Sequence, residues 1–277
     1  MMLNYFKKPK GPNFSKADPV SLTFSGTKVN FMCPGYSYQM IDQDEEDKLP
    51  TDINLYDFEQ YKSVLFSHFD GPYNQAIDIA AFGCFHTKWG FRKGLLGNKY
   101  DEGTFSFTLS IRHINRFGSL FKPQNMERAV IEALELSFGP KGTWAGEGCG
   151  GRRYRAPEDW SIQHSNTLTW LHYCVTELIG GDSKEHVWCI PISDEHFISF
   201  RFSDTGYSSN QLIEAHKVLA EQVVSSCRIE YSPDALAQMD KAAQEGLGEP
   251  YSEHREPLAW EEYDLEPERF ERKEKCY

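Results

Sequence analysis

Residues 146–155, GEGCGGRRYR, combine side chains and backbone types that several kinds of chemistry require. Cys149 is a potential nucleophile, because a thiolate becomes reactive when a neighbouring cation or histidine lowers its pKa. The glycines around it let backbone N–H groups approach an anion. Arginines that follow can hold a phosphate or a carboxylate through paired hydrogen bonds. The segment therefore predicts an anion-binding site at Arg152, Arg153 and Arg155.

The spacing within this segment differs from two common motifs. It has no Lys-Ser or Lys-Thr to close a phosphate-binding P-loop, and it has no serine at the centre of a Gly-x-Ser-x-Gly turn. Nucleophilic catalysis would need a histidine beside Cys149, and His164 and His172 are the candidates along the chain. Two interpretations stay open: a site for an anion or a reaction, and a mobile connection between a helix and a strand.

Two Cys/His pairs raise the question of a metal. His172 and Cys174 are two residues apart, and Cys84 and His86 repeat that spacing. Residues i and i+2 of a strand share a face, so two such pairs could in principle form a Cys₂His₂ zinc site. Cysteine is also a common core residue. We interpret the pairs as core residues and predict neither a metal nor a cofactor.

Acidic residues form a second class of candidates. The formal net charge of −12 argues against nucleic-acid binding, because a protein that neutralises phosphates needs a basic face. A basic protein partner is favoured instead. Aromatic anchors framed by charged residues are typical of recognition surfaces. The predicted partner-binding residues lie in an acidic loop and near the C-terminus: Asp44, Glu45, Glu46, Trp260, Glu261, Glu262 and Tyr263.

The sequence also predicts a compartment. Basic residues near the start are not followed by the apolar run of a secretory signal, and no 18 consecutive residues are apolar. The seven cysteines are scattered and form no Cys-x-x-Cys pair, which favours reduced thiols in a cytoplasm. We expect a cytoplasmic protein without a membrane span, of undetermined oligomeric state.

The elements that must position these residues follow an α+β pattern. Apolar alternation around Gly26 predicts two strands within 20–33. Further strands are expected at 75–89 and 104–115, and at 167–178, 187–192 and 197–202. Short polar connections between the last three favour an antiparallel meander.

Cap residues place the predicted helices. Asn125 is the expected N-cap of a helix that ends before Gly139, and Ser208 with Gln211 has capping-box spacing for a helix over 210–226. Ser232-Pro233 predicts another helix, and apolar spacing predicts one at 54–69. The predicted fold class is α+β, an antiparallel β-sheet (meander) with packed helices. It comprises one main domain, 1–248, and a charged aromatic C-terminal tail, 249–277.

Two patches resemble a known family. KVNFMCPGY, residues 28–36, is similar to the opening strand-Pro-Gly-aromatic element of Mog1/PsbP-like proteins, the group that includes DcrB-type bacterial domains. HFISFRF, residues 196–202, followed by SSCRIEY, residues 225–231, is similar to that group's closing strand–helix–strand unit. The resemblance implies a non-enzymatic α/β sandwich that binds proteins, including adaptors of bacterial secretion systems. It implies no catalytic residue.

These observations predict a non-catalytic cytosolic protein that binds a basic effector or toxin, in an immunity-like or secretion-adaptor-like role. The alternative is an enzyme or small-ligand binder that uses Cys149, Arg152 and Arg153.

Overall fold

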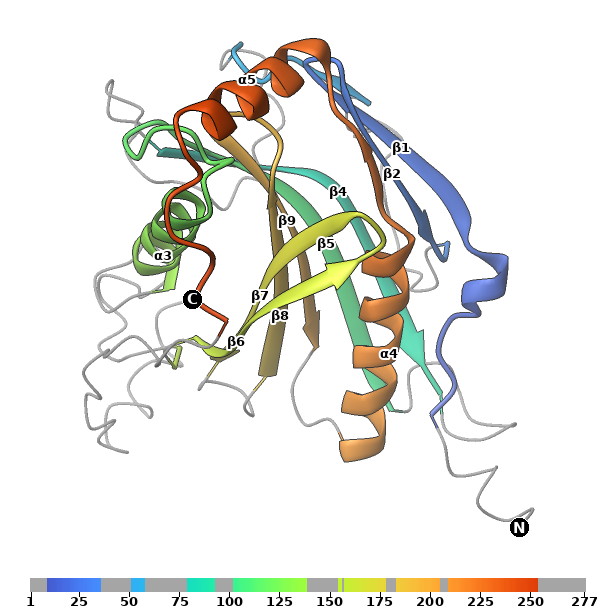
Figure 1. Ribbon diagram of the computed structural model, residues 1–277. Coiled ribbons are helices and arrows are strands. Elements are labelled where there is room, and N and C mark those ends of the chain that lie inside the picture. Colours follow the sequence, from blue (N-terminus) through green and yellow to red (C-terminus); the bar gives the residue numbers. More distant parts are fainter. Residues whose placement is uncertain are drawn as a thin grey trace, which may run out of the picture.

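The computed structural model describes residues 9–35, 51–57, 79–92, 102–138, 154–155, 157–177, 183–204 and 209–253. Within these residues, two β-sheets, three α-helices and a short 3-10 helix, η1 (Phe14–Lys16), form an α+β fold (Figure 1). The predicted helix at 54–69 lies mostly outside the described residues, which stop at Asp57 and resume at Ile79.

The larger sheet has six strands in the order β4-β5-β9-β8-β7-β6, and all neighbours are antiparallel. The last three predicted strands are consecutive neighbours in this sheet, so the predicted meander is confirmed there. The edge strand β6 was not predicted, because its sequence, EDWSIQHS, buries only Trp160. The strands are β4 (Ile79–Phe91), β5 (Gly103–Ile114), β6 (Glu158–Ser165), β7 (Leu168–Glu177), β8 (Ser183–Pro191) and β9 (His196–Asp204).

A second sheet has the order β10-β2-β1-β3. Its central hairpin confirms the two strands predicted around Gly26. Ser25 and Gly26 both have positive φ, 46° and 86°, as tight hairpin turns that match strand twist require. This separate sheet was not predicted, because β2 pairs with a strand about 200 residues later in the chain. The strands are β1 (Asp18–Phe24), β2 (Thr27–Cys33), β3 (Asp52–Ile53) and β10 (Arg228–Glu230).

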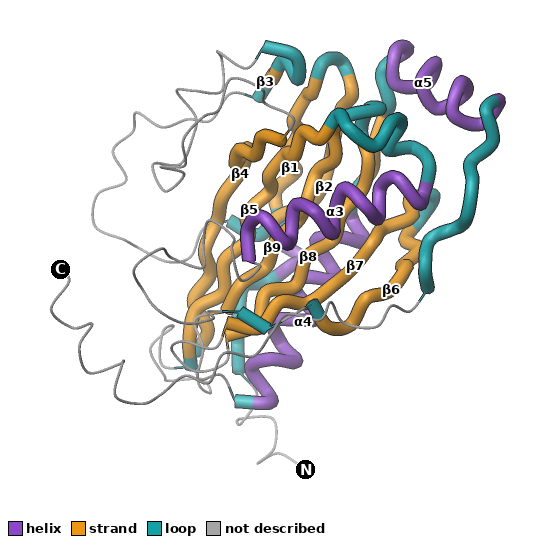
Figure 2. The backbone as a smooth tube through the Cα atoms, turned by 90° about the vertical axis from the view of Figure 1, so that its left-hand side faces the viewer, coloured by secondary structure: helices purple, strands orange, loops and turns teal. Residues whose placement is uncertain are grey.

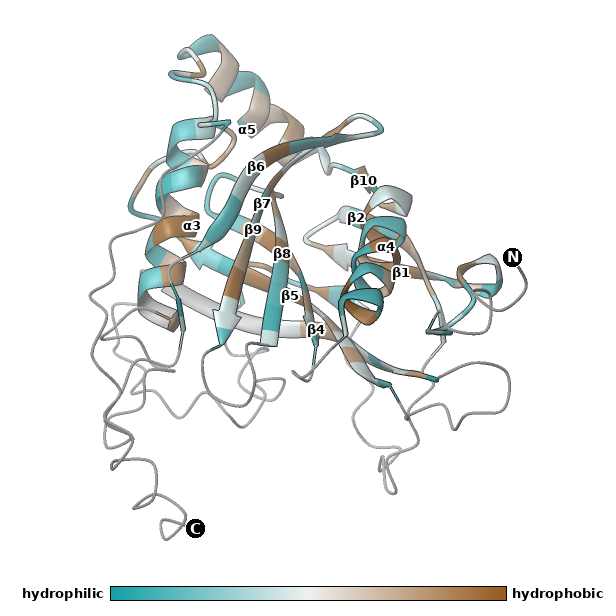
Figure 3. Cartoon of the chain, turned by 90° about the horizontal axis from the view of Figure 1, so that it is seen from below, coloured by the Kyte–Doolittle hydropathy of each residue, from teal (hydrophilic) through white to brown (hydrophobic). Residues whose placement is uncertain are grey.

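An aromatic core fills the space between the two sheets and α4 (Asn210–Ser226). In Figure 3, α4 stands between the β1–β2 hairpin and the six-stranded sheet. Phe107 is fully buried there, with its ring centroid 4.5 Å from that of Phe202 and 5.3 Å from that of Phe200. Burying large aromatic side chains is among the strongest stabilising contributions that a core of this type receives.

The opposite face of the six-stranded sheet is covered by α3 (Pro123–Phe138). Figure 2 shows α3 crossing that face while α4 lies on the other side. Alternation along the strands explains this arrangement, because successive side chains point to opposite faces. In β7, Trp170 packs toward α4, whereas Leu171 and Tyr173 pack toward α3.

The helix starts correct two predictions. The helix α3 begins at Pro123, two residues before the predicted cap, and the Asn125 side chain donates to the carbonyl oxygen of Ser119. Proline suits a first helical position because its missing N–H needs no partner there. The N-cap of α4 is Ser209, not Ser208, since its Oγ accepts from the backbone N–H of Leu212. Ser232 caps α5 (Pro233–Gln244) as predicted.

Candidate functional site: an acidic groove along α3

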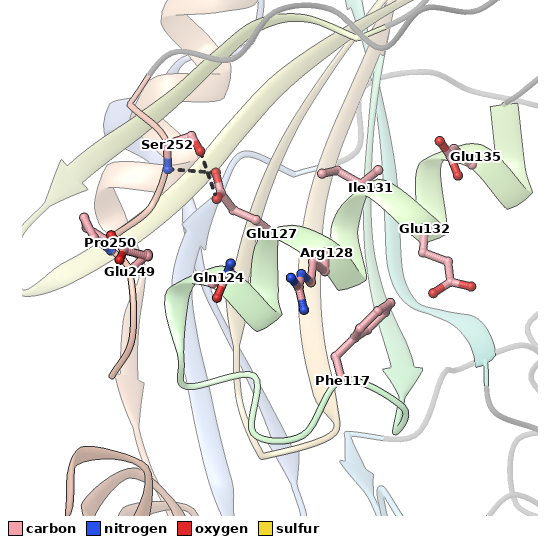
Figure 4. A pocket seen from close by; sticks show the side chains of 10 residues that line it. All are labelled: Phe117, Gln124, Glu127, Arg128, Ile131, Glu132, Glu135, Glu249, Pro250 and Ser252. Atoms are coloured by element: carbon pink, nitrogen blue, oxygen red, sulfur yellow. Dashed lines mark hydrogen bonds between the residues drawn. The ribbon is translucent and has the colours of Figure 1, made fainter. Parts of the chain in front are cut away.

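A groove of about 520 Å³ lies between α3 and the residues that follow α5 (Figure 4). One wall is a single stripe of α3, because helix positions three, four, seven and eight apart share a side. The other wall is residues 249–252, which we call the strap. The lining residues are Gln124, Glu127, Arg128, Ile131, Glu132 and Glu135 of α3, Phe117 from the loop before it, and Glu249, Pro250 and Ser252 of the strap.

The groove is strongly acidic over an apolar base. Four glutamates and one arginine line it, while the half-buried Phe117 and Ile131 supply apolar surface. Glu135 lies in the last turn of α3, and that turn carries no basic residue. A helix C-terminus already has a partial negative charge, so acids there add to the negative potential. The arrangement therefore attracts cations.

Glu127 is a structural member of the groove. Its side chain is only 5% exposed, and its carboxylate accepts three hydrogen bonds. Oε1 accepts from Trp160 Nε1 at 3.1 Å and from the Ser252 backbone N–H at 2.9 Å, and Oε2 accepts from Ser252 Oγ at 3.2 Å. Glu127 thus holds the strap in place, and its carboxylate is taken up by these bonds. Glu132, Glu135 and Glu249 supply the other carboxylates of the groove.

The groove edge already holds one guanidinium group. Arg116 forms an ion pair with Glu132, and its guanidinium carbon lies 5.9 Å from the centroid of the Phe117 ring. This distance is within the range at which an aromatic face attracts a cation. The Arg116 side chain is 42% exposed, so solvent reaches this pair.

The two histidines predicted as bases for Cys149 do not converge. His164 is exposed on β6, with Nδ1 3.2 Å from Thr169 Oγ1. On β7, His172 is two residues from Trp170 and so shares its face of the sheet, the face that packs against α4. On β6, His164 is four residues from Trp160 and shares the other face, which packs against α3. The two imidazoles therefore occupy opposite faces of the sheet.

His172 belongs instead to a polar network in the sheet. Its Nδ1 lies 3.3 Å from Ser161 Oγ, and its Nε2 lies 3.3 Å from Nδ1 of His186. Burial, with the neighbouring His186 as a second cause, lowers the pKa of His172 to about 3. An imidazole with so low a pKa is a weak base, so the network suits packing better than proton abstraction.

The two Cys/His pairs are also apart. Cys84 and His86 lie on β4, whereas His172 and Cys174 lie on β7, and three strands separate them. Four strand spacings amount to about 19 Å, far beyond the reach of one metal ion. Among the residues that the structure describes, no three His, Cys, Asp or Glu side chains gather as metal ligands.

A second polar cluster lies beneath α3. Arg201 donates to both oxygens of Glu185, at 3.0 and 2.8 Å, and Ser203 Oγ donates to the same carboxylate at 2.9 Å. The cavity beside Arg201 and Arg112 measures only about 10 Å³, roughly the space of one water molecule. This cluster is a half-buried structural ion pair, and the cavity beside it has no room for a ligand.

Most predicted site residues lie outside the described part of the chain. Arg155 is the described member of the predicted anion site: its side chain is exposed, and its backbone N–H donates to the carbonyl of Thr176 at 2.8 Å. The others outside the described residues are Cys149, Arg152, Arg153, Asp44, Glu45, Glu46, Trp260, Glu261, Glu262 and Tyr263.

The acidic groove itself was missed at the level of sequence. A usable signal existed, because Glu132 and Glu135 are three residues apart on a predicted helix and so share a side. Nothing local distinguishes such a side from an ordinary solvated helix face. The strap that makes it a wall comes from the other end of the chain.

Comparisons with known proteins give little further information. No protein-family model and no curated protein matches the chain. One solved structure that resembles it is LpqN, involved in cell envelope biogenesis of Mycobacterium tuberculosis, with a TM-score of 0.32 and 11% sequence identity. That match covers 57% of this chain and 99% of LpqN. In the described residues, no helix combines the length and the apolar character needed to span a membrane.

Proposed function

We propose that this chain is a non-catalytic protein-binding protein whose acidic groove along α3 takes a basic segment of a partner protein. The observation that carries the proposal is the groove's lining. Besides Glu127, which holds the strap, three glutamates line it with a single arginine, Arg128, over an apolar base. A net charge of −12 attracts a basic partner toward the molecule, and the acidic groove is the site where that partner would bind.

The dimensions of the groove suit a short segment. The α3 stripe from Gln124 to Glu135 is about 16 Å long, at about 1.5 Å per helical residue. An extended peptide covers that length with about five residues. Phe117 and Ile131 can contact the aliphatic stems of lysine or arginine while the charged ends reach the carboxylates.

The role that fits this proposal is that of a cytoplasmic immunity-like or secretion-adaptor-like protein. Such proteins recognise one partner through charge and a few buried contacts, and they need no cofactor. The resemblance of residues 28–36, 196–202 and 225–231 to Mog1/PsbP-like proteins implies a role of the same kind. Membership of that group stays a prediction.

The test is a fluorescence-anisotropy titration with a labelled ten-residue peptide that carries four basic residues. We expect micromolar affinity at low salt and a loss of about tenfold in the Glu132→Gln/Glu135→Gln double variant. The matched control is Glu214→Gln/Glu221→Gln, which removes the same charge from the exposed side of α4. Equal losses in both variants would show that only the overall charge matters and would overturn the assignment to the groove.

A further inference from the structure

We infer that the groove selects arginine over lysine in its partner, and that Arg116 occupies the arginine position until the partner arrives. This inference rests on the proposed function, because it specifies which basic side chain the groove recognises. Three described residues carry it: Glu132, Phe117 and Arg116.

The position is defined by what Arg116 contacts. Glu132 supplies a carboxylate from α3, and Phe117 supplies an aromatic face from the loop before α3. Both residues also line the groove, so the two groups that hold Arg116 face the space that a ligand would enter (Figure 4). Arg116 itself does not line it. The guanidinium of Arg116 thus lies at the edge of the groove, against two of its lining residues.

The chemistry of this position favours a guanidinium over an ammonium group. A guanidinium is planar, stacks on aromatic faces and can present two parallel N–H donors to one carboxylate. An ammonium group is more strongly hydrated and offers no plane to stack. A carboxylate next to an aromatic ring thus discriminates between the two side chains by shape as well as by charge.

Partner binding is consequently an exchange of one arginine for another. The Arg116 side chain is 42% exposed, so it can leave for solvent without breaking the core. Exposed ion pairs contribute little to stability, which makes the exchange inexpensive. Removing Arg116 should then tighten partner binding, although Arg116 lies in the same region as the binding site.

The experiment compares three peptides that differ only in their basic residues, which are arginine, lysine or neutral citrulline. Each is titrated against the full chain and against Arg116→Gln, Arg128→Gln and Glu132→Gln. Arg128 lines the groove and is exposed, so Arg128→Gln is the matched control for the loss of one positive charge.

We expect the wild type to bind the arginine peptide about five times more tightly than the lysine peptide. Arg116→Gln should increase the affinity for the arginine peptide about five- to tenfold. Arg128→Gln should increase the affinities for the arginine and lysine peptides by the same, smaller factor. Glu132→Gln should remove the preference for arginine. Thermal melting of each variant serves as the control that it is folded.

Two results contradict different parts of the account. Equal affinity for the arginine and lysine peptides, with equal effects of Arg116→Gln and Arg128→Gln, would overturn the selectivity but leave a basic-segment groove in place. Binding of the citrulline peptide as tightly as the others, or binding of none of them, would overturn the proposed function together with this inference.

Discussion

The carboxylate of Glu127 and residue Ser252, which are 125 positions apart in the chain, are joined by two hydrogen bonds of 2.9 and 3.2 Å. The same carboxylate accepts from the indole N–H of Trp160. One buried side chain therefore connects a helix, an edge strand and the strap. The acidic groove exists because these three elements meet at Glu127.

Replacing Glu127 should destabilise the fold and open the groove. In Glu127→Ala the Trp160 indole N–H and the strap lose their acceptor, and bonds to a charged acceptor contribute about 1.5–3 kcal/mol each. Because removed bonds are partly replaced by water, we expect a loss of about 2–4 kcal/mol in the free energy of unfolding, measured with urea. Trp160 is 6% exposed, so its fluorescence should move toward that of a more hydrated indole.

Glu135→Ala is the control for this change. Glu135 lies on the same helix and is exposed, so its replacement should alter the free energy of unfolding by no more than about 0.5 kcal/mol. Similar losses in the two variants would mean that Glu127 contributes only general charge to the helix, and the proposed role of the strap contact would be wrong.

Acid should destabilise the protein through its buried histidines. Burial lowers the pKa of His172, His196 and His216 to about 3 each, below the ordinary value near 6.5. Below pH 6.5 the unfolded chain therefore binds more protons than the folded chain, and stability falls as the pH drops toward 3. At pH 5 the loss is about 2 kcal/mol for each such histidine, which urea unfolding at pH 7.5 and pH 5 can measure.

His216 offers the clearest variant for this effect. Its ring stacks on Phe105 at a centroid distance of 4.3 Å, and within the described residues neither ring nitrogen has a hydrogen-bond partner. His216→Leu should reduce the stability difference between the two pH values by about 2 kcal/mol. His164→Gln, at an exposed position, is the matched control for replacing a histidine. An unchanged difference in His216→Leu would contradict the burial of a neutral imidazole there.

Thiol reactivity separates the binding hypothesis from the enzymatic one. Cys33, Cys84, Cys174, Cys189 and Cys227 are buried, and burial raises their pKa, to about 12 for Cys33 and Cys189. We therefore expect these five thiols to be unreactive in the native state, which leaves Cys149 and Cys276 of the seven cysteines. We expect the native protein at pH 7.5 to react with at most two equivalents of a thiol reagent, and the unfolded protein with seven.

The rate at which Cys149 reacts decides the alternative. A rate no greater than that of a free peptide thiol agrees with a binding protein. Alkylation of Cys149 many times faster than that, and absent in Cys149→Ser, would favour the nucleophilic loop and the enzyme hypothesis. More than two reactive thiols in the native state would contradict the described burial.

Local signals in the sequence predicted the parts of the fold that depend on neighbours along the chain. The turn at Ser25-Gly26, the cap at Ser232 and the meander of β7, β8 and β9 follow from turn residues, caps and alternation. Asn125 misled because its side chain suits a cap, yet Pro123 already satisfies the first helical position.

The parts that escaped prediction depend on contacts between distant segments. Strand β10 forms by pairing with β2, and β6 forms by pairing with β7 although its own sequence alternates weakly. The groove is the same kind of feature. No local sequence pattern marks Glu127 or Ser252, and the groove forms only because the two residues contact each other in the fold. The acidic partner-binding residues predicted from the sequence, at 44–46 and 260–263, lie outside the described residues, so that assignment and the basic partner both stay predictions.

The most direct test of the central claim is to locate a bound basic peptide. An arginine-rich peptide with a photoactivatable residue is cross-linked to the full chain, and the modified residues are identified by mass spectrometry. We predict cross-links concentrated in residues 123–138 and 249–253, lost on competition with unlabelled peptide. Cross-links concentrated at 42–47 or 260–263, or spread evenly over the acidic surface, would contradict the groove as the partner site.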